Sequence, residues 1–184
     1  APTGIGKTAA TLAPTLKYAI DKGLTVFFLT SRHTQHYIAI ETLKKIKEKH
    51  DLKFLTTDLI GKKWMCGVNG IQMLRSGEFS EYCRKVREDN KCEFYNNLYS
   101  KQGKMTVKAR KVAQDLEDVS PNHTEAVIDL CKEEKICPYY MSMFLTKNSK
   151  VIVTDYFYLF NNNIRDSFLS RIGKELSKSI IIVD

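Results

Sequence analysis

The glycine-rich run at the start of the chain constrains its fold more than any other feature. Residues 1–8 have the sequence APTGIGKT, and a stretch with helical character follows them through Ile20. Glycines let backbone N–H groups approach a phosphate closely, and a helix that follows directs its positive end at the anion. We interpret residues 1–8 as a phosphate-binding loop, which favours an α/β fold.

The loop predicts how ATP and Mg²⁺ would be held. Four residues are expected to surround the phosphates with their backbone: Thr3, Gly4, Ile5 and Gly6. Lys7 would neutralise phosphate charge, and the Thr8 hydroxyl would bind Mg²⁺. Ala1 stands where the general pattern has glycine, so the loop is a variant form.

The other end of the chain supplies a carboxylate that complements the loop. Residues 179–183 (SIIIV) predict a buried strand, and Asp184 follows directly. Together with the loop, Asp184 is a candidate catalytic residue that binds Mg²⁺ directly or through another ligand. The absent initiating methionine and the end on an apolar strand suggest an excised fragment.

The pattern between the two ends predicts a parallel sheet with an insertion. We expect a helix over 8–20 with a kink at Pro14, ending near Gly23, then a strand at 24–30 and a helix at 38–46. The rhythm breaks near residue 57 and returns with a strand at 151–156, a turn at 161–163, a helix at 168–176 and the last strand. The predicted sheet domain spans 1–57 and 149–184, and residues 58–148 form an insertion.

All five cysteines lie in the insertion. Four of them, Cys66, Cys83, Cys92 and Cys137, are separated by sixteen, eight and forty-four residues, a spacing that selects no particular metal. Cys131 lies on the apolar face of a predicted helix and is expected to be a buried thiol. For the other four, metal binding and unconnected thiols are the alternatives. Because the insertion has few apolar runs, metal–thiolate bonds would supply the order that burial cannot.

The charge distribution suggests a partner that carries phosphate. The formal net charge is +8; residues 61–112 hold twelve Lys and Arg against five acids, and residues 113–134 hold one against seven. Such asymmetry favours a groove for nucleic acid, although two solvated faces would look the same. No apolar run is long enough to span a bilayer, so no membrane partner is expected.

Four cysteine blocks give the chain a resemblance to a known family. The blocks are KKWMC at 62–66, YC at 82–83, CEFY at 92–95 and CPYY at 137–140, and they resemble those of XPD-type iron–sulfur DNA helicases of superfamily two. Residues 151–159 (VIVTDYFYL) are similar to the strand that precedes the DEAH box of that family. Residues 31–35 (SRHTQ) are similar to its motif Ia.

The resemblance implies a first RecA-like motor domain, interrupted by a mostly helical iron–sulfur insertion. It implies ATP-driven 5′→3′ unwinding of DNA, with single-stranded and forked DNA as partners, and a role in nucleotide excision repair. By matching, a 4Fe-4S cluster is held by Cys66, Cys83, Cys92 and Cys137. The nucleic-acid contacts fall on four residues: Arg32, Thr34, Gln35 and Lys62, of which Lys62 has either a DNA role or a cluster-supporting one.

Further expectations follow from the same resemblance. The motor would be monomeric or part of a repair or transcription complex, nuclear in a eukaryote and cytoplasmic otherwise. Because the Glu-Ala-His that follows the aspartate in the family is absent after Asp184, we expect these 184 residues alone to be inactive. The alternatives are an iron–sulfur helicase of the DinG or Fanconi-associated type, or a zinc-stabilised nucleic-acid-binding module. Aromatic residues beside the cysteines either shield the cluster or stack on bases.

Overall fold

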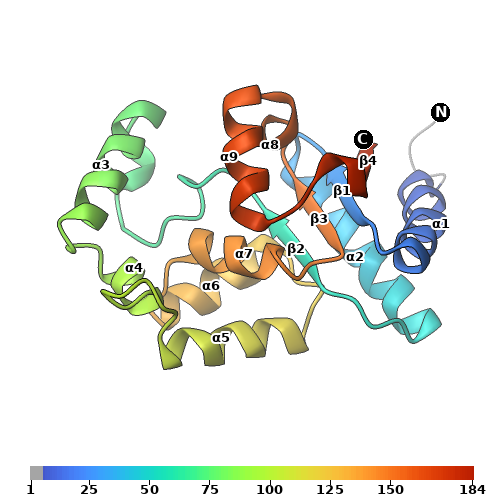
Figure 1. Cartoon of the computed structure of the whole chain (residues 1–184), viewed down its shortest axis with the longest axis horizontal. Helices are drawn as coiled ribbons and strands as arrows, with labels where there is room; N and C mark the ends of the chain where they lie inside the picture. Colours follow the sequence, from blue (N-terminus) through green and yellow to red (C-terminus); the bar gives the residue numbers. More distant parts are fainter. Residues whose placement is uncertain (1–5) are drawn as a thin grey trace.

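The computed structural model describes residues 6–184, and a four-stranded parallel sheet forms its centre (Figure 1). The strands are β1 (Thr25–Leu29), β2 (Thr56–Leu59), β3 (Val151–Thr154) and β4 (Ser179–Val183), in the spatial order β2-β3-β1-β4. β1 pairs with both β3 and β4. Parallel neighbours require crossover connections, which here are helical. The predicted α/β class with a parallel sheet is confirmed.

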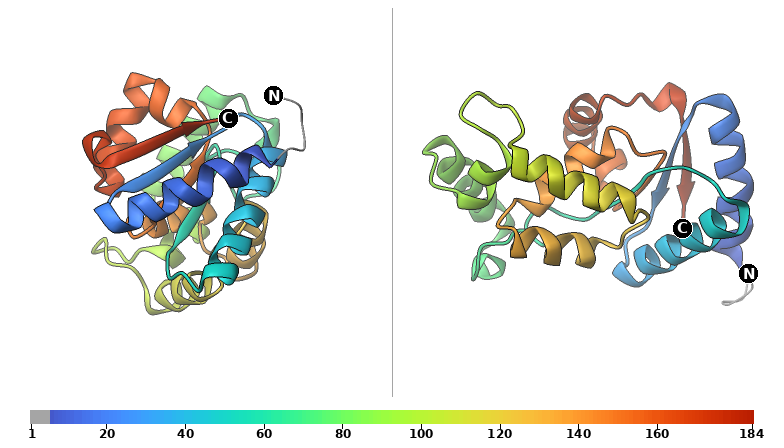
Figure 2. Two further views of the ribbon diagram at one scale, coloured as in Figure 1. Left: turned by 90° about the vertical axis from the view of Figure 1, so that its right-hand side faces the viewer. Right: turned by 90° about the horizontal axis from the view of Figure 1, so that it is seen from below.

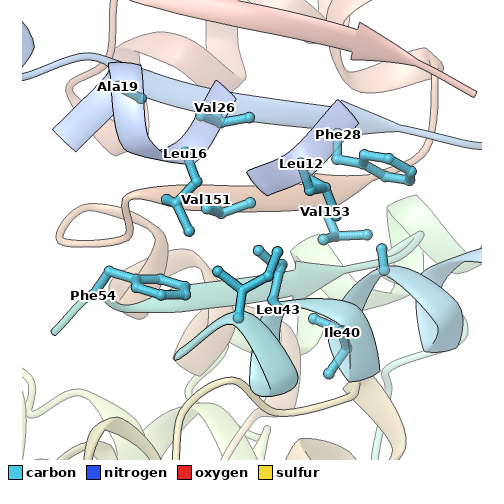
Figure 3. Close-up of a cluster of buried hydrophobic side chains, with 12 residues drawn as sticks. Leu12, Leu16, Ala19, Val26, Phe28, Ile40, Leu43, Phe54, Val151 and Val153 are labelled. Atoms are coloured by element: carbon cyan, nitrogen blue, oxygen red, sulfur yellow. The ribbon is translucent and has the colours of Figure 1, made fainter. Parts of the chain in front are cut away.

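Helices cover both faces of the sheet. α1 (Lys7–Lys22) and α2 (His33–His50) pack on one face (Figure 3). The opposite face is covered by three helices: α7 (Pro138–Thr146), α8 (Phe157–Phe160) and α9 (Asn162–Ile172). Val26 and Phe28 of β1 point to the first face and Phe27 to the second, where its ring meets Phe168 edge-on at 6.4 Å. Because its side chains point alternately into two buried layers, β1 is apolar from Val26 to Leu29.

Every named element between β2 and β3 is helical. This part of the chain contains a short 3₁₀ turn, η1 (Ile71–Met73), and the helices α3 (Ser76–Glu88), α4 (Glu93–Leu98), α5 (Val107–Asp118), α6 (Thr124–Glu133) and α7. α3 and α4 lie farthest from the sheet, and α5, α6 and α7 lie between them and β2 (Figures 1 and 2). A helical insertion therefore projects from one side of the sheet.

The insertion has a hydrophobic core of its own, which corrects the expectation that it buries too little to order itself. The core residues come from α4 to α7: Leu98, Ala109, Val112, Ala113, Leu116, Val127, Cys131, Ile136, Met141 and Leu145. In α5 the apolar residues recur at helical spacing, so they form one apolar helix face although they are not consecutive in the sequence. Cys131 is fully buried in this core, as predicted.

β2 was not predicted, because three of its four residues are polar. Thr56, Thr57 and Asp58 are nevertheless buried. The Ser120 hydroxyl accepts a hydrogen bond from the Thr56 N–H at 2.9 Å and donates one to the Thr56 carbonyl at 3.3 Å. A side chain thus takes the place of a neighbouring strand along this edge. The proposed domain boundary at residues 57 and 58 falls inside β2.

The last third of the chain differs from the prediction in three places. β4 is not a buried strand: Ile181 and Val183 are 42% and 59% exposed, because among the described residues β4 pairs only with β1. The expected turn at 161–163 instead begins α9, where the Asn161 side chain accepts from the Ile164 N–H at 3.2 Å. Gly173, at φ 65°, ends α9 at Ile172, and η2 (Leu176–Lys178) follows. α1, by contrast, continues through Pro14 and ends at Gly23 as predicted.

Candidate nucleotide and nucleic-acid sites

The predicted phosphate site lies at the start of α1. Thr3, Gly4 and Ile5 fall outside the described residues. Gly6 has φ 75°, a left-handed conformation that only glycine adopts without strain, and Lys7 begins the helix. The first turn of α1 contains no acidic residue and no side-chain cap, so its N–H groups and positive dipole end suit an anion.

Asp184 lies at the same edge of the sheet as the start of α1. α1 returns through Gly23 directly into β1, so its first turn lies at the carboxyl edge of the strands (Figure 2). The Asp184 N–H donates to the Leu29 carbonyl at 3.0 Å, and the Tyr156 hydroxyl donates to the Asp184 carbonyl. The structure therefore places the end of the loop and the carboxylate on one side of the sheet.

The residues similar to motif Ia form the first turn of α2 rather than a separate turn. Arg32 is the N-cap residue in extended conformation, and α2 begins at His33. Arg32 and Thr34 are exposed, and Gln35 is half-buried. Like α1, α2 has no side-chain cap and no acid in its first turn. This turn also follows the carboxyl end of β1, where it could contact a phosphate backbone.

The four predicted metal ligands come from three helices and a loop. Cys66 lies in the loop after β2, and Cys83 is on α3. Cys92 and Cys137 are the N-cap residues of α4 and α7. The Cys137 N–H donates to the Phe94 carbonyl at 2.9 Å, which holds these two helix starts together. Helix N-termini favour thiolates, so two of the four positions suit a negatively charged ligand.

Burial and the charges of neighbouring cysteines shift the pKa of three of these thiols. Burial raises the pKa of Cys66 and of Cys92, and the charge of Cys83 raises both further. Burial, together with the charges of Cys92, Cys66 and Cys83, raises the pKa of Cys137 to about 12. Within residues 6–184, however, no three Cys, His, Asp or Glu side chains are close enough together to hold a metal ion. The thiols converge without forming a coordination sphere, although an all-sulfur donor set suits an iron–sulfur cluster or zinc.

Two cations lie beside the cysteines. The Lys62 ammonium is 4.9 Å from the centre of the Tyr140 ring and donates to the Tyr140 hydroxyl at 3.3 Å. Arg87, which the sequence reasoning missed, lies 5.3 Å from the Tyr95 ring and 5.2 Å from the Tyr140 ring. Its Nε donates to the Cys83 carbonyl at 3.1 Å. The spacing of four residues between Cys83 and Arg87 on one helix could have revealed it.

A basic and aromatic pocket opens beside this cluster of rings. Its volume is about 340 Å³, and its lining combines cations with aromatic rings: Arg87, Lys147, Arg171, Tyr95, Tyr99, Tyr140 and Phe144. The lining joins α3, α4 and α7 of the insertion to α9 of the sheet layer. Of the other predicted aromatic residues, Trp64 and Tyr82 are 57% and 39% exposed. Positive charge with accessible rings is the composition of single-strand binding surfaces.

A parallel sheet of this order, with a glycine-led helix start and a carboxylate at its carboxyl edge, is an α/β nucleotide-binding architecture of the kind found in RecA-like domains. The chain belongs to the DEAD_2 family, whose model matches residues 21–184. The resemblance inferred from the cysteine blocks is therefore confirmed at the level of the family.

The curated relatives are DNA helicases. The chain is 25% identical over 137 residues to the ATP-dependent DNA helicase CHL1 of Kluyveromyces lactis, covering 74% of this chain and 16% of that protein. It is 24% identical over 208 aligned residues to the general transcription and DNA repair factor IIH helicase subunit XPD/RAD3 of Saccharomyces cerevisiae, covering 99% of this chain and 25% of that one. The chain thus spans a quarter or less of these relatives.

Solved structures show the same fold. A chain described as XPD helicase matches all of this chain and 28% of its own length, with a TM-score of 0.59 and 24% identity. A truncated XPD matches all of this chain and 45% of its own length, with a TM-score of 0.57 and 22% identity. The RecA-like fold with an inserted helical region is confirmed.

Proposed function

We propose that this chain is part of the first motor domain of an ATP-dependent DNA helicase of the XPD type. The observation that carries the proposal is the meeting of three features at the carboxyl edge of one sheet. These are the start of α1 at Gly6 and Lys7, the carboxylate of Asp184, and the uncapped first turn of α2. An ATP site and a nucleic-acid contact on one rigid edge are what a translocating motor requires.

In this proposal the chain binds ATP with its own backbone and side chains. The N–H groups of the loop and of the first turn of α1 surround the phosphates, and Lys7 neutralises their charge. Thr8 and Asp184 would hold Mg²⁺, directly or through another ligand, and the ion would supply positive charge that stabilises the phosphates. The positions of Thr3, Gly4 and Ile5 in the site follow from the sequence pattern.

DNA would contact two places on the chain. Arg32, Thr34 and Gln35 would bind the phosphate backbone at the start of α2. The basic and aromatic pocket between α3, α7 and α9 would accept an unpaired base, with its cations balancing the phosphates. The resemblance to XPD-type helicases supports single-stranded and forked DNA as substrates and 5′→3′ as the direction of movement.

The cysteines would hold a 4Fe-4S cluster that cross-links the insertion. Cys66, Cys83, Cys92 and Cys137 are the ligands in this proposal, and the cluster supplies four metal–sulfur bonds when bound. Lys62 is surrounded by Tyr139, Tyr140 and the thiol of Cys83. These surroundings favour the cluster-supporting role of Lys62 over a DNA contact.

The cellular role is proposed from the relatives. One of them is a transcription and DNA repair factor subunit by name, which supports nucleotide excision repair and membership of a repair complex, in the nucleus if the organism is eukaryotic. In the part of the chain that the structure describes, no helix is long and apolar enough to cross a membrane.

The test uses the full-length protein that contains this chain. Single-stranded DNA should stimulate its ATP hydrolysis, and it should unwind a forked duplex with a free 5′ tail. Lys7→Ala should abolish both activities, because it removes the positive charge that neutralises the ATP phosphates. DNA binding should remain, because Lys7 is not among the proposed DNA contacts. Absence of unwinding by the unmodified protein would contradict the motor. We expect the 184 residues expressed alone to be inactive, since they cover 28% of a similar helicase chain.

The alternative functions differ in metal and in motor activity. A zinc-stabilised binding module would bind DNA without DNA-stimulated ATP hydrolysis and would be colourless. An iron–sulfur protein purified without oxygen is brown, and metal analysis then gives iron and sulfide. A helicase of the DinG or Fanconi-associated type would share the brown colour and would differ in its preferred DNA structure.

A further inference from the structure

A fully buried histidine lies directly behind the predicted DNA-contacting turn of α2. His36 is in the first turn of the helix, one residue after Gln35, and its side chain is 0% exposed. Its Nδ1 lies 2.5 Å from Oδ1 of Asp58 on β2. Its Nε2 lies 3.6 Å from Oδ1 of Asp155, which follows β3. One imidazole thus joins α2 to the carboxyl ends of two strands.

Asp58 extends this contact into the insertion. Its second oxygen, Oδ2, accepts a hydrogen bond from the Thr124 N–H at 2.9 Å, at the first turn of α6. The same oxygen lies 3.6 Å from Nε2 of His123, the N-cap residue of α6. The Tyr37 ring, on α2, packs edge-on against His123 at 5.7 Å. The start of α2 and the start of α6 therefore share one buried carboxylate.

The charges of this group favour a protonated His36. Burial alone lowers its pKa, but the carboxylates of Asp155 and Asp58 outweigh burial and raise the pKa of His36 to about 9. An imidazolium between two carboxylates forms a buried ion pair. Removal of one partner from such a pair leaves the other as an uncompensated buried charge.

We propose that His36 and Asp58 are positioning residues that fix the first turn of α2, with Arg32, Thr34 and Gln35, against helix α6 of the insertion. The inference rests on the proposed function, because it assigns that turn to DNA. α6 leads through Ile136 to Cys137, so the pair connects the DNA-contacting turn to the helix that precedes the fourth cysteine. DNA affinity should then depend on a pair that touches no DNA.

The first test measures the connection without DNA. In the full-length protein, Asp58→Asn should raise amide hydrogen exchange in residues 33–37 and in residues 124–128 together, because both segments bond to the same carboxylate. Faster exchange in only one of the two segments would overturn the inference, whether or not the protein is a helicase. Asp155→Asn, which removes only the longer contact, should give a smaller change in the same direction and serves if Asp58→Asn fails to fold.

The second test measures the consequence for DNA. Single-stranded DNA affinity should fall about tenfold in His36→Gln and in Asp58→Asn, and no further in the double variant, since coupled partners are not additive. Glu41→Gln is the control, because Glu41 pairs with Lys44 on the same helix at 2.8 Å at the surface. Unchanged affinity in His36→Gln would contradict the positioning role. If the unmodified protein binds no DNA, the proposed function fails, and the exchange experiment still decides the connection.

The pH dependence separates positioning from general stability. The pKa of His36 is raised to about 9, so the ion pairs of the protonated imidazole stabilise the start of α2 fully at pH values below the ordinary histidine pKa. This stabilisation is lost as pH rises through about 9. Wild-type DNA affinity should therefore decline across that range, and that of His36→Gln should not. The charged groups that face His36 are Asp58 and Asp155, and His123 lies on the far side of Asp58. The His33 ring is 6.1 Å from the His36 ring. The decline of DNA affinity with rising pH should persist in His123→Gln. If His123→Gln abolished that decline, the assignment to His36 would be overturned.

Discussion

The two parts of the insertion differ in what holds them together. The helical core, α5 to α7 with Leu98 of α4, buries ten residues in one cluster. The α3 lobe, residues 61–92, buries only Met65, Ile71 and Phe79. Yet the lobe carries three of the four candidate ligands, Cys66, Cys83 and Cys92, and the fourth, Cys137, begins a helix of the core. Thiolate bonds would tie the weakly packed part to the well-packed part, so metal dependence is expected to be local.

Metal removal should produce the largest effect, and hydrogen-exchange protection should respond differently in the α3 lobe and in the helical core. Chelation of the full-length protein should abolish hydrogen-exchange protection in α3, because few buried contacts remain to order it. Protection in α5 to α7 and in β1 should persist, since their cores contain no metal ligand other than Cys137. Loss of protection in both parts at once would show that the insertion orders as one unit around the metal. Unchanged protection in α3 would contradict a structural metal altogether.

A core truncation should reverse that pattern. Leu116→Ala on α5 removes a side chain that is 3% exposed and should destabilise the helical core by about 2–5 kcal/mol. Exchange should accelerate throughout α5, α6 and α7. Phe79→Ala, in α3, is the matched truncation in the other part and should accelerate exchange only in residues 61–92. Equal spread of both effects would show that the two parts are not independent.

The same contrast explains what could be predicted from the sequence. β1 and β3 are mostly apolar runs and were predicted, each with two residues too many, because strands buried on both faces need few polar positions. β2 was missed because two of its buried polar side chains are satisfied by distant residues: Ser149 lies 2.7 Å from Thr57, and Asp58 accepts from the Thr124 N–H. The exposure of β4 was also missed, because a local run of isoleucines does not reveal how many neighbours a strand has.

The candidate site shows a similar limit. Gly6, Lys7 and Asp184 were predicted from local patterns, whereas the ligand set of four cysteines was implied by the family resemblance. The structure places Gly6, Lys7 and Asp184 at the carboxyl edge of the sheet. His36 could not be found from local patterns, and the spacing of Arg87 from Cys83 on α3 marks it only as a neighbour of that cysteine. Their significance depends on Tyr140 and Asp58, which are distant in sequence, so only the fold assembles these contacts.

A glycine substitution should produce an intermediate effect at the junction of the two parts. A Cβ on Gly67 would lie 2.4 Å from Cε1 of Phe94, so the ring would have to move. Gly67→Ala should destabilise the α3 lobe by about 1–3 kcal/mol, measured from exchange in residues 61–92.

Gly77 provides the control for that substitution. It lies in α3, and a Cβ there would meet no atom within 4 Å. Gly77→Ala should stabilise α3 by about 0.5–1 kcal/mol, because alanine is the better helix former. If both substitutions destabilised the lobe, the effect of Gly67→Ala could no longer be attributed to a steric clash with the Phe94 ring.

The smallest effect should come from the surface charges of α3. Arg84 and Glu88 form an ion pair at 2.8 Å with both side chains more than half exposed. Arg84→Ala should change the stability of the lobe by no more than about 0.5 kcal/mol, because water and salt screen such pairs. Exchange measured at low and high salt gives the value directly. A larger loss that disappears at high salt would mean that surface charge, rather than thiolate bonding, orders the α3 lobe, and the contrast between the two parts of the insertion would then have an electrostatic origin.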